Sequence, residues 1–417
     1  MKTVARYYIT LMVAAVIVCL VCAFTTSAHA DVESQPNNYT TVTVKTSDRD
    51  FTYVDEPITA SDFTVAEQIE LRRINAPLDQ KLILVDTCLE KGADYKAALE
   101  VCFPRLIAAV DSAAEYLYKP PVDAQTVYKG NGRFAVTPEV TGRMLDEKKL
   151  YASLYCALRF SGGGEVTAHT LPIEPSVKKA ELEANILFRG KYTTEYSTST
   201  EARAHNVSLA LSKFDGAVIP AGGTLSFNKT VGARTEQNGF KSAKIIVDGK
   251  YVDGVGGGVC QASTALYNAA LVAGLTCSAN AHSICPSYCP AGLDAMISGM
   301  SDLVITNTTA HDVYIAVNVA NKRGTVTVFG EKNEYTIVPE SVIVKTVKHE
   351  ESEQVDTEHK YFDSTAVSGD RALVSPGKDG VVSETFLKYY KNGTMVKRVK
   401  IRSNEYKAVP QIIAVNP

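Results

Sequence analysis

The stretch that decides the fold of the central region is Gly254-Val255-Gly256-Gly257-Gly258-Val259-Cys260-Gln261. Three consecutive glycines let the backbone bend sharply and approach another strand or a ligand closely. After Gln261, apolar residues recur on one helical face through Ala273, and Gly274 followed by Leu275 is typical of a helix C-terminal cap. The pattern therefore predicts a helix that begins close to Cys260.

Cys260 in this position is a candidate nucleophile. Unpaired N–H groups and the positive end of the helix dipole favour a thiolate over a thiol at a helix N-terminus. His282 lies 22 residues further on and could take the proton, and Asp294 could orient the imidazole. The order Cys, His, acid is similar to that of papain-like and NlpC-like peptidases, although the separation of Cys260 and His282 is short for those folds. These three residues are the predicted catalytic set.

Two other interpretations of the same residues stay open. Cys260 could be a small buried residue at a tight packing point, with His282 and Asp294 as a structural pair. Zinc is the other, because Cys277, His282, Cys285 and Cys289 form a C-x4-H-x2-C-x3-C pattern in an expected strand region. The spacing is irregular, so we predict neither a metal nor a cofactor.

Outward from this region, composition limits the classes of function. The chain has 417 residues, which at roughly 100 to 200 residues per domain indicates two to four domains. Its formal net charge is -3, so it has no basic excess with which to displace counterions from phosphates, and nucleic acid is not predicted as a partner. It contains no Trp, so any surface that stacks on sugars must use some of its 21 Tyr residues.

The first thirty residues read as a targeting segment. Lys2 and Arg6 precede an uncharged apolar run of 16 residues, Ile9 to Phe24, and Ala28-His29-Ala30 is an A-x-A cleavage site. The run is shorter than the ~20 residues of a spanning helix, so we expect a cleaved signal peptide, with a retained membrane anchor as the alternative. Seven of the nine cysteines follow Ala30, and an odd number leaves at least one thiol unpaired.

Local patterns predict an α+β, multi-domain chain. Thr41–Lys45 alternates like an edge strand, Asp62 could cap a helix, and Ala97 to Leu117 repeats apolar residues at helical spacing. Asp146 could cap a further helix that runs through Leu158. Near the C-terminus, Asn392-Gly393 predicts a type I′ hairpin turn. The expected divisions are a signal peptide (1–30), a polar lead-in (31–61), a small α+β module (62–175), a linker (176–191), a central α+β domain (192–333) and a small all-β module (336–417).

At this point the residues of the central domain resemble a known family, VanW, which is named from vancomycin-resistance clusters and is widespread in Gram-positive bacteria. The residues that carry the resemblance are Thr193-Thr194, Arg203, Asn206, Phe227-Asn228, Val231-Gly232, Gly239-Phe240, Gly256 to Thr264, His282-Ser283, Asp294-Ala295 and Asp302-Leu303. The chain departs from the family's pattern before His282, where it has Ser278-Ala279-Asn280-Ala281 instead of Glu-Arg, and at Leu293, where Arg is usual. The candidate ligand-binding residues are Arg203, Asn206, Asn228, Gly256, Gly257, Gly258 and Gln261.

Two further resemblances flank this domain. Residues from Pro121 through Phe134 to Pro175 look like a peptidoglycan-binding domain, and residues from Ser375 through Tyr389-Tyr390 to Ile413 look like the G-five (G5) domain of extracellular proteins. Together they imply a secreted or cell-wall-associated protein that binds peptidoglycan and recognises or processes its stem peptide. A retained anchor would place it instead on the outer face of the cytoplasmic membrane. The alternative function is a cysteine-dependent amidase or transpeptidase that uses Cys260, His282 and Asp294.

Overall fold

The computed structural model describes residues 39–58, 64–247, 250–363 and 365–417. The predicted targeting segment and the expected cap at Asp62 lie outside these residues. The chain divides into two compact units, one formed by the residues up to Asp123 with Glu139–Ser176, the other by Ala124–Pro138 with Val177–Pro417. Both contain helices and strands, which confirms the α+β, multi-domain fold class. Among the described residues, no helix has both the length and the apolar character that crossing a membrane requires.

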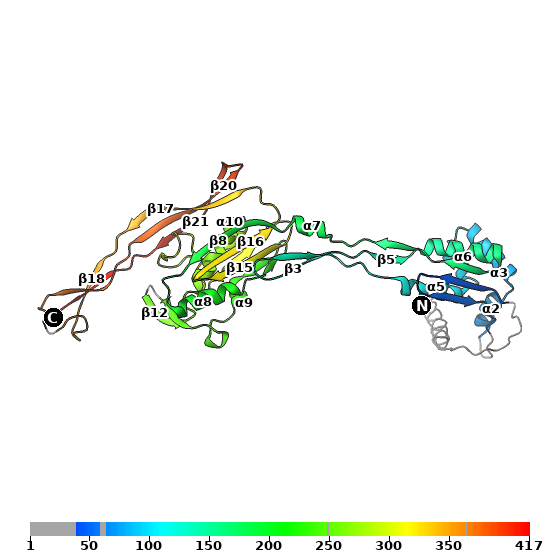
Figure 1. The fold of residues 1–417 in the computed structure, drawn as a ribbon, viewed down its shortest axis with the longest axis horizontal. Coiled ribbons are helices and arrows are strands. Elements are labelled where there is room, and N and C mark those ends of the chain that lie inside the picture. Colours follow the sequence, from blue (N-terminus) through cyan, green and yellow to red (C-terminus); the bar gives the residue numbers. More distant parts are fainter. Residues whose placement is uncertain (1–38, 59–63, 248–249, 364) are drawn as a thin grey trace. The chain divides into compact units, whose positions relative to one another are not determined.

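The first unit is built around a three-stranded sheet of order β2-β1-β6 (Figure 1). Its elements are β1 (Thr41–Lys45), β2 (Asp50–Val54), α2 (Val65–Ile74), α3 (Leu78–Glu90), α4 (Tyr95–Glu100), α5 (Pro104–Leu117), α6 (Glu147–Ser161) and β6 (Gly164–Thr167), with β5 (Gly142–Leu145) pairing β7 (Thr170–Ile173). β1 runs antiparallel to β2 and parallel to β6. The expectation of an edge strand at 41–45 is therefore wrong, because Val42 and Val44 are buried in the core and β1 is paired on both sides.

Local chemistry sets the helix ends in this unit. Thr64 and Glu67 form a capping box that begins α2. The helical spacing over 97–117 is divided between α4 and α5, because Pro104 begins a new helix at a position where its missing N–H costs nothing. Asp146 caps α6 by accepting from the Lys149 backbone N–H, as predicted.

The second unit contains a four-stranded sheet of order β8-β16-β15-β9, against which helix α10 (Val259–Val272) packs (Figure 1). Its other elements are β3 (Gln125–Tyr128), β4 (Phe134–Thr137), α7 (Lys179–Ala184), β8 (Leu187–Glu195), α8 (Glu201–Ser212), β9 (Val218–Ile219), β10 (Thr224–Ser226), α9 (Phe227–Val231), η2 (Glu236–Asn238), β11 (Ser242–Val247), β12 (Lys250–Val255), β13 (Thr276–Ser278), β14 (Val304–Thr306), β15 (Val313–Ala320) and β16 (Arg323–Gly330). α10 is buried from Gln261 to Leu271, so it is the central helix of this core.

The β3–β4 hairpin belongs to the second unit by its contacts. Phe134 packs against Tyr314 and Phe329, with ring centroids 5.2 and 5.8 Å away. The Tyr128 hydroxyl donates to Asp215 at 2.5 Å. Aromatic packing and hydrogen bonds, including one between Thr126 and Tyr314 at 3.1 Å, thus anchor this excursion of the chain on the sheet that carries α10.

The C-terminal part of the second unit is all β, as predicted. It consists of β17 (Thr336–Val347), β18 (Glu351–Val355), β19 (Arg371–Ser375), β20 (Gly380–Lys391), β21 (Thr394–Tyr406) and β22 (Gln411–Val415), in two three-stranded sheets of order β17-β20-β21 and β18-β22-β19. Asn392 and Gly393 have φ of 51° and 81°, so the two-residue turn between β20 and β21 has the positive φ values of type I′. β20 and β21 pair over a long antiparallel stretch, and the end of β21 contacts the loop between β13 and β14.

Candidate functional site

The glycine stretch shapes the start of α10. Gly258 is the N-cap residue and has φ of 101°, and Gly256 has φ of 88°, a region that side chains rarely adopt. A Cβ on Gly257 would lie 2.6 Å from the Lys244 carbonyl oxygen of β11. The three glycines therefore let the loop press against β11 and turn directly into the helix, which confirms that Cys260 lies in the first turn of α10.

Cys260 is partly buried in that first turn. Its Sγ donates to the Ile297 carbonyl at 3.5 Å. Only a protonated sulfur can make this bond, so the thiol form has a partner of its own. A thiolate would depend instead on the helix N-terminus and on a nearby cation.

His282 and Asp294 form a buried pair beside Cys260. Asp294 Oδ2 lies 2.6 Å from His282 Nδ1 and also accepts from the His282 backbone N–H at 2.7 Å. Burial lowers the pKa of His282, but hydrogen bonds with Asp294 and Cys260 outweigh it and raise that pKa to about 9. With Nδ1 held by the carboxylate, Nε2 is the ring nitrogen left to exchange a proton with the thiol.

The carboxylate is held from its other side by the C-terminal β strands. Tyr406 donates its hydroxyl proton to Asp294 Oδ1 at 2.5 Å, and Arg402 Nη2 donates to the same oxygen at 3.2 Å. Burial alone would raise the pKa of Asp294, but the hydrogen bonds from His282 and Tyr406 lower it below its usual range. Asp294 is fully buried and still ionised because these donors replace its water.

Tyr288 completes the surroundings of His282. Its ring meets the imidazole edge-on, with centroids 6.4 Å apart at 82°, and its hydroxyl oxygen is buried. Burial is the main cause that raises the pKa of Tyr288 well above its ordinary value, followed by electrostatic interaction with Cys260 and Cys289. Tyr288 is thus a neutral phenol that shields the pair from water.

The polar side chains predicted to bind a ligand make hydrogen bonds within the chain that hold the loop and helix. Asn206 donates to the Lys241 and Gly257 carbonyls and accepts from the Lys241 N–H. Asn228 donates to Ser298 and Ser301 and accepts from Arg234. Gln261 ties α10 to β8 through Thr194 and Glu195, and Arg203 Nη1 donates to Ser199 at 2.6 Å. Ligand binding by these residues stays a prediction.

The cysteines beyond Cys260 are present as thiols. All seven cysteines in the described part of the chain are free, including Cys285 and Cys289. Those two lie in the irregular loop between β13 and β14, so the expected strand at this position is wrong. Burial raises the pKa of Cys277 to about 12 and that of Cys289 further. Within the described residues no group of His, Cys, Asp and Glu side chains is arranged to hold a metal ion.

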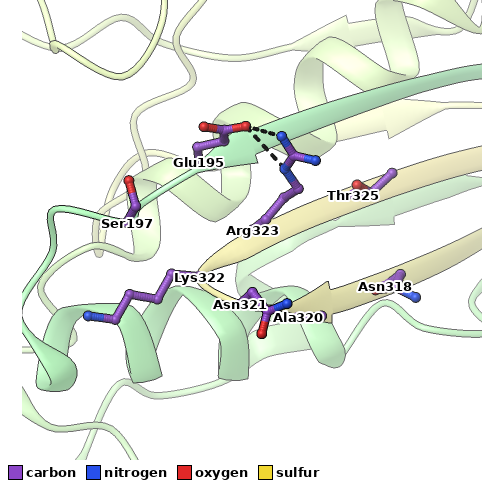
Figure 2. Close-up of a pocket in the computed structure, with 8 residues that line it drawn as sticks. All are labelled: Glu195, Ser197, Asn318, Ala320, Asn321, Lys322, Arg323 and Thr325. Atoms are coloured by element: carbon purple, nitrogen blue, oxygen red, sulfur yellow. Dashed lines mark hydrogen bonds and ion pairs between the residues drawn. The ribbon is translucent and has the colours of Figure 1, made fainter.

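The second unit has a cavity that Cys260 does not line. It has a volume of about 360 Å³ at the turn between β15 and β16, and Figure 2 shows Glu195 hydrogen-bonded to Arg323 among its lining residues. The side chains that line it are Glu195, Ser197, Asn318, Ala320, Asn321, Lys322, Arg323 and Thr325. None of the predicted site residues is among these described lining residues, so this cavity supplies no argument for the chemistry.

Comparison with known families identifies the central region. The family model described as "VanW like protein" matches residues 202–329, a range that contains Cys260, His282 and Asp294. The middle of the chain is a VanW-like domain. The model "Putative peptidoglycan binding domain" matches residues 48–166 and the model "G5 domain" matches residues 344–417. These matches confirm the three resemblances, and together they support a cell-wall-associated protein.

Among curated proteins, the uncharacterized protein YoaR of Bacillus subtilis (strain 168) is similar to this VanW-like chain. The two are 35% identical over 185 residues, which is 44% of this chain and 59% of YoaR. The chain therefore spans well under two thirds of this relative's length. Two solved structures, a "Crystal structure of HP0197-G5" and an "IgA1 Protease G5 domain structure", each cover 20% of the chain, with 14% and 15% identity and TM-scores of 0.12 and 0.13.

Proposed function

We propose that this VanW-like chain is a cysteine acyl-transfer enzyme that is held on peptidoglycan and acts on amide bonds of the stem peptide. The observation that carries the chemistry is the Asp294–His282 pair, buried beside a cysteine in the first turn of a helix. The substrate class rests on the peptidoglycan-binding and G5 matches that flank the domain. Amidase and transpeptidase activities share the first half of this reaction and differ in the acceptor.

The reaction begins from the ion pair in which the Cys260 proton already resides on His282. The thiolate then attacks the amide carbonyl carbon, the C–N bond breaks, and the departing amine takes the proton back from the imidazolium. A thioester on Cys260 remains. Water or a second amine attacks it, His282 accepts the acceptor's proton, and the C–S bond breaks to return the thiolate–imidazolium ion pair. Asp294 keeps Nδ1–H of His282 oriented throughout and does not itself take a proton.

A binding role without chemistry is the second candidate. The hydrogen bond from the Cys260 thiol to the Ile297 carbonyl favours it, because that bond holds the sulfur in its protonated form. In this case the chain recognises the stem peptide, and the buried Cys260–His282–Asp294 cluster stabilises the loop after α10.

Incubation of the full chain with purified peptidoglycan fragments distinguishes the two functions. We expect a covalent adduct on Cys260 that intact-protein mass spectrometry detects after acid quench, and new or shortened muropeptides in the chromatogram. Cys260→Ser should lose both signals while it sediments normally with sacculi. Cys156→Ser is the matched control, because Cys156 is an exposed thiol in the first unit and should leave both signals unchanged. Unaltered muropeptides with the wild-type chain, together with normal sedimentation, would leave only the binding role.

A further inference from the structure

We infer that Arg402 and Tyr406, at the end of β21, are positioning residues for the Cys260 site, so that the C-terminal β module is a working part of the reacting centre. This inference rests on the proposed function for the role of Cys260. It assigns residues to the site that lie in the range matched by the G5 model, not in the VanW-like range. Neither residue touches the thiol, and both act through Asp294.

Tyr406 is built into a relay of hydrogen bonds that ends on Asp294. The Gly292 backbone N–H donates to the Tyr406 hydroxyl oxygen at 2.6 Å, which directs the hydroxyl proton onto Asp294 Oδ1. Burial and the adjacent carboxylate raise the pKa of Tyr406 far above its ordinary value, so the phenol stays a donor at every physiological pH. Tyr406 itself is 1% exposed, which excludes a water as the substitute donor.

Arg402 supplies a charge in addition to a hydrogen bond. Asp294 carries one negative charge and protonated His282 one positive charge, so the pair alone is neutral. Arg402 adds a permanent positive charge 3.2 Å from Asp294 Oδ1, and its guanidinium lies 5.5 Å from the ring centroid of Tyr267 on α10. Because a fully buried carboxylate is costly, both donors favour the ionised Asp294 that keeps His282 protonated.

The same strands hold the loop that carries the pair. Thr385 of β20 donates to the Gly292 carbonyl at 3.0 Å, and Ser341 of β17 donates to the Ala291 carbonyl at 2.6 Å. Past the end of β21, the Lys407 backbone N–H donates to the Ser283 carbonyl at 2.8 Å. Contacts from three strands and the segment that follows therefore fix the part of the loop that leads from Ser283 to Asp294, within a single compact unit.

The other titratable groups around the pair do not carry this charge balance. Burial raises the pKa values of Tyr267, Tyr288, Cys285 and Cys289, so all four are neutral near pH 7. The Lys378 ammonium donates to the Cys285 backbone carbonyl. Arg402 and His282 are thus the cations in contact with Asp294.

The test is the pH profile of Cys260 alkylation by iodoacetamide in the full chain, followed by peptide mapping. The acid side of this profile reports loss of the Cys260 thiolate, which the imidazolium–carboxylate pair stabilises. We expect Tyr406→Phe and Arg402→Met each to move its midpoint up by about one pH unit, which is roughly a tenfold slower reaction at pH values below the wild-type midpoint. Arg402→Lys should recover part of the shift, because it restores the charge without the planar fork.

Matched controls lie on the same two strands. Arg398→Met removes an arginine four residues earlier on β21 that pairs with Glu340, and Tyr389→Phe alters a tyrosine of β20 that packs on Tyr335. Both should leave the profile unchanged. If Tyr406→Phe and Arg402→Met fold but react like these controls, the inference is wrong, whatever the wild-type chain does to peptidoglycan. If the profile moves but wild type leaves muropeptides unaltered, the proposed function fails and the positioning role stands.

Discussion

At the scale of single residues, the proposed acyl transfer depends on whether the proton between Cys260 and His282 resides on the imidazole. If Cys260 reacts as a nucleophile, His282→Ala should slow its alkylation strongly near pH 7, because the imidazolium that stabilises the thiolate is gone. Asp294→Asn should slow it less, since Asp294 orients the ring and does not contact the sulfur. Iodoacetamide rates between pH 5 and 9 check both. A Cys260 that alkylates no faster than Cys156 at pH 6 would contradict the enzyme.

His282 also links folding stability to pH. Its pKa is about 9 in the folded chain against 6.5 for an ordinary histidine, so the folded state binds the proton more tightly. This contribution is fully present below pH 6.5 and is lost as the pH rises through 9. We therefore expect the free energy of unfolding to fall between those pH values in wild type and to fall less in His282→Gln. Urea denaturation at pH 6 and pH 9.5 measures this fall in the free energy of unfolding. An equal fall in wild type and in His282→Gln would refute the linkage.

The residues of the site divide by whether a local pattern announces them. Cys260 is predictable from its glycine stretch and helix, and His282 and Asp294 from their chemistry and order along the chain. Arg402 and Tyr406 are not, because they reach Asp294 across sequence separations of 108 and 112 residues. Asn206 and Asn228, which the sequence suggests as ligand contacts, donate hydrogen bonds to backbone carbonyls, and ligand binding by them stays a prediction.

At the scale of elements, the glycine turn before α10 is the feature most sensitive to change. We expect Gly257→Ala to lower the free energy of unfolding by roughly 1 to 3 kcal/mol, because its methyl group would meet backbone atoms of β11 that cannot withdraw easily. Gly299→Ala is the matched control, since a Cβ there meets nothing within 4 Å. Chemical denaturation compares the two. Equal stabilities would show that the loop and β11 can separate without cost.

Helix and turn signals were readable where one residue dictates the geometry. Asp146 and the Asn392-Gly393 turn act through their own side chains or φ angles, so the structure confirms them directly. Pairing partners are a different matter. Thr41–Lys45 has the alternation of an edge strand but lies between β2 and the distant β6, and nothing within the strand encodes a partner more than a hundred residues away.

At the scale of the whole molecule, the chain crosses between its two units three times. The β3–β4 hairpin leaves the first unit after Asp123, packs on the second, and returns at Glu139. No composition shift marks this excursion, because its residues form an ordinary hairpin. Long-range aromatic contacts and hydrogen bonds assign the hairpin to the second unit. The domain limits expected at 62–175, 192–333 and 336–417 stay predictions, beside family matches over 48–166, 202–329 and 344–417.

The excursion suggests how to isolate the first unit without the β3–β4 hairpin, whose aromatic side chains pack on the second unit. Val122 and Val140 exchange backbone hydrogen bonds at 2.8 and 2.9 Å, so Asp123 and Glu139 are the next opposed positions of an antiparallel pair. A two-residue Asn-Gly turn should close that pair. Residues 39–123 joined in this way to 139–176 keep the unit's buried core and omit the aromatic side chains of the hairpin.

We expect this joined first unit to sediment with purified sacculi at low salt. The range matched by the peptidoglycan-binding model lies mostly within it, and the chain has no basic excess that would bind the wall by charge alone. Binding should therefore persist at 0.3 M salt, unlike a polyelectrolyte contact. The full chain with Cys260→Ser should sediment to the same extent, because holding the wall and cutting the stem peptide are assigned to different units. A joined unit that folds cooperatively yet stays in the supernatant, while the full chain sediments, would move wall binding to the second unit.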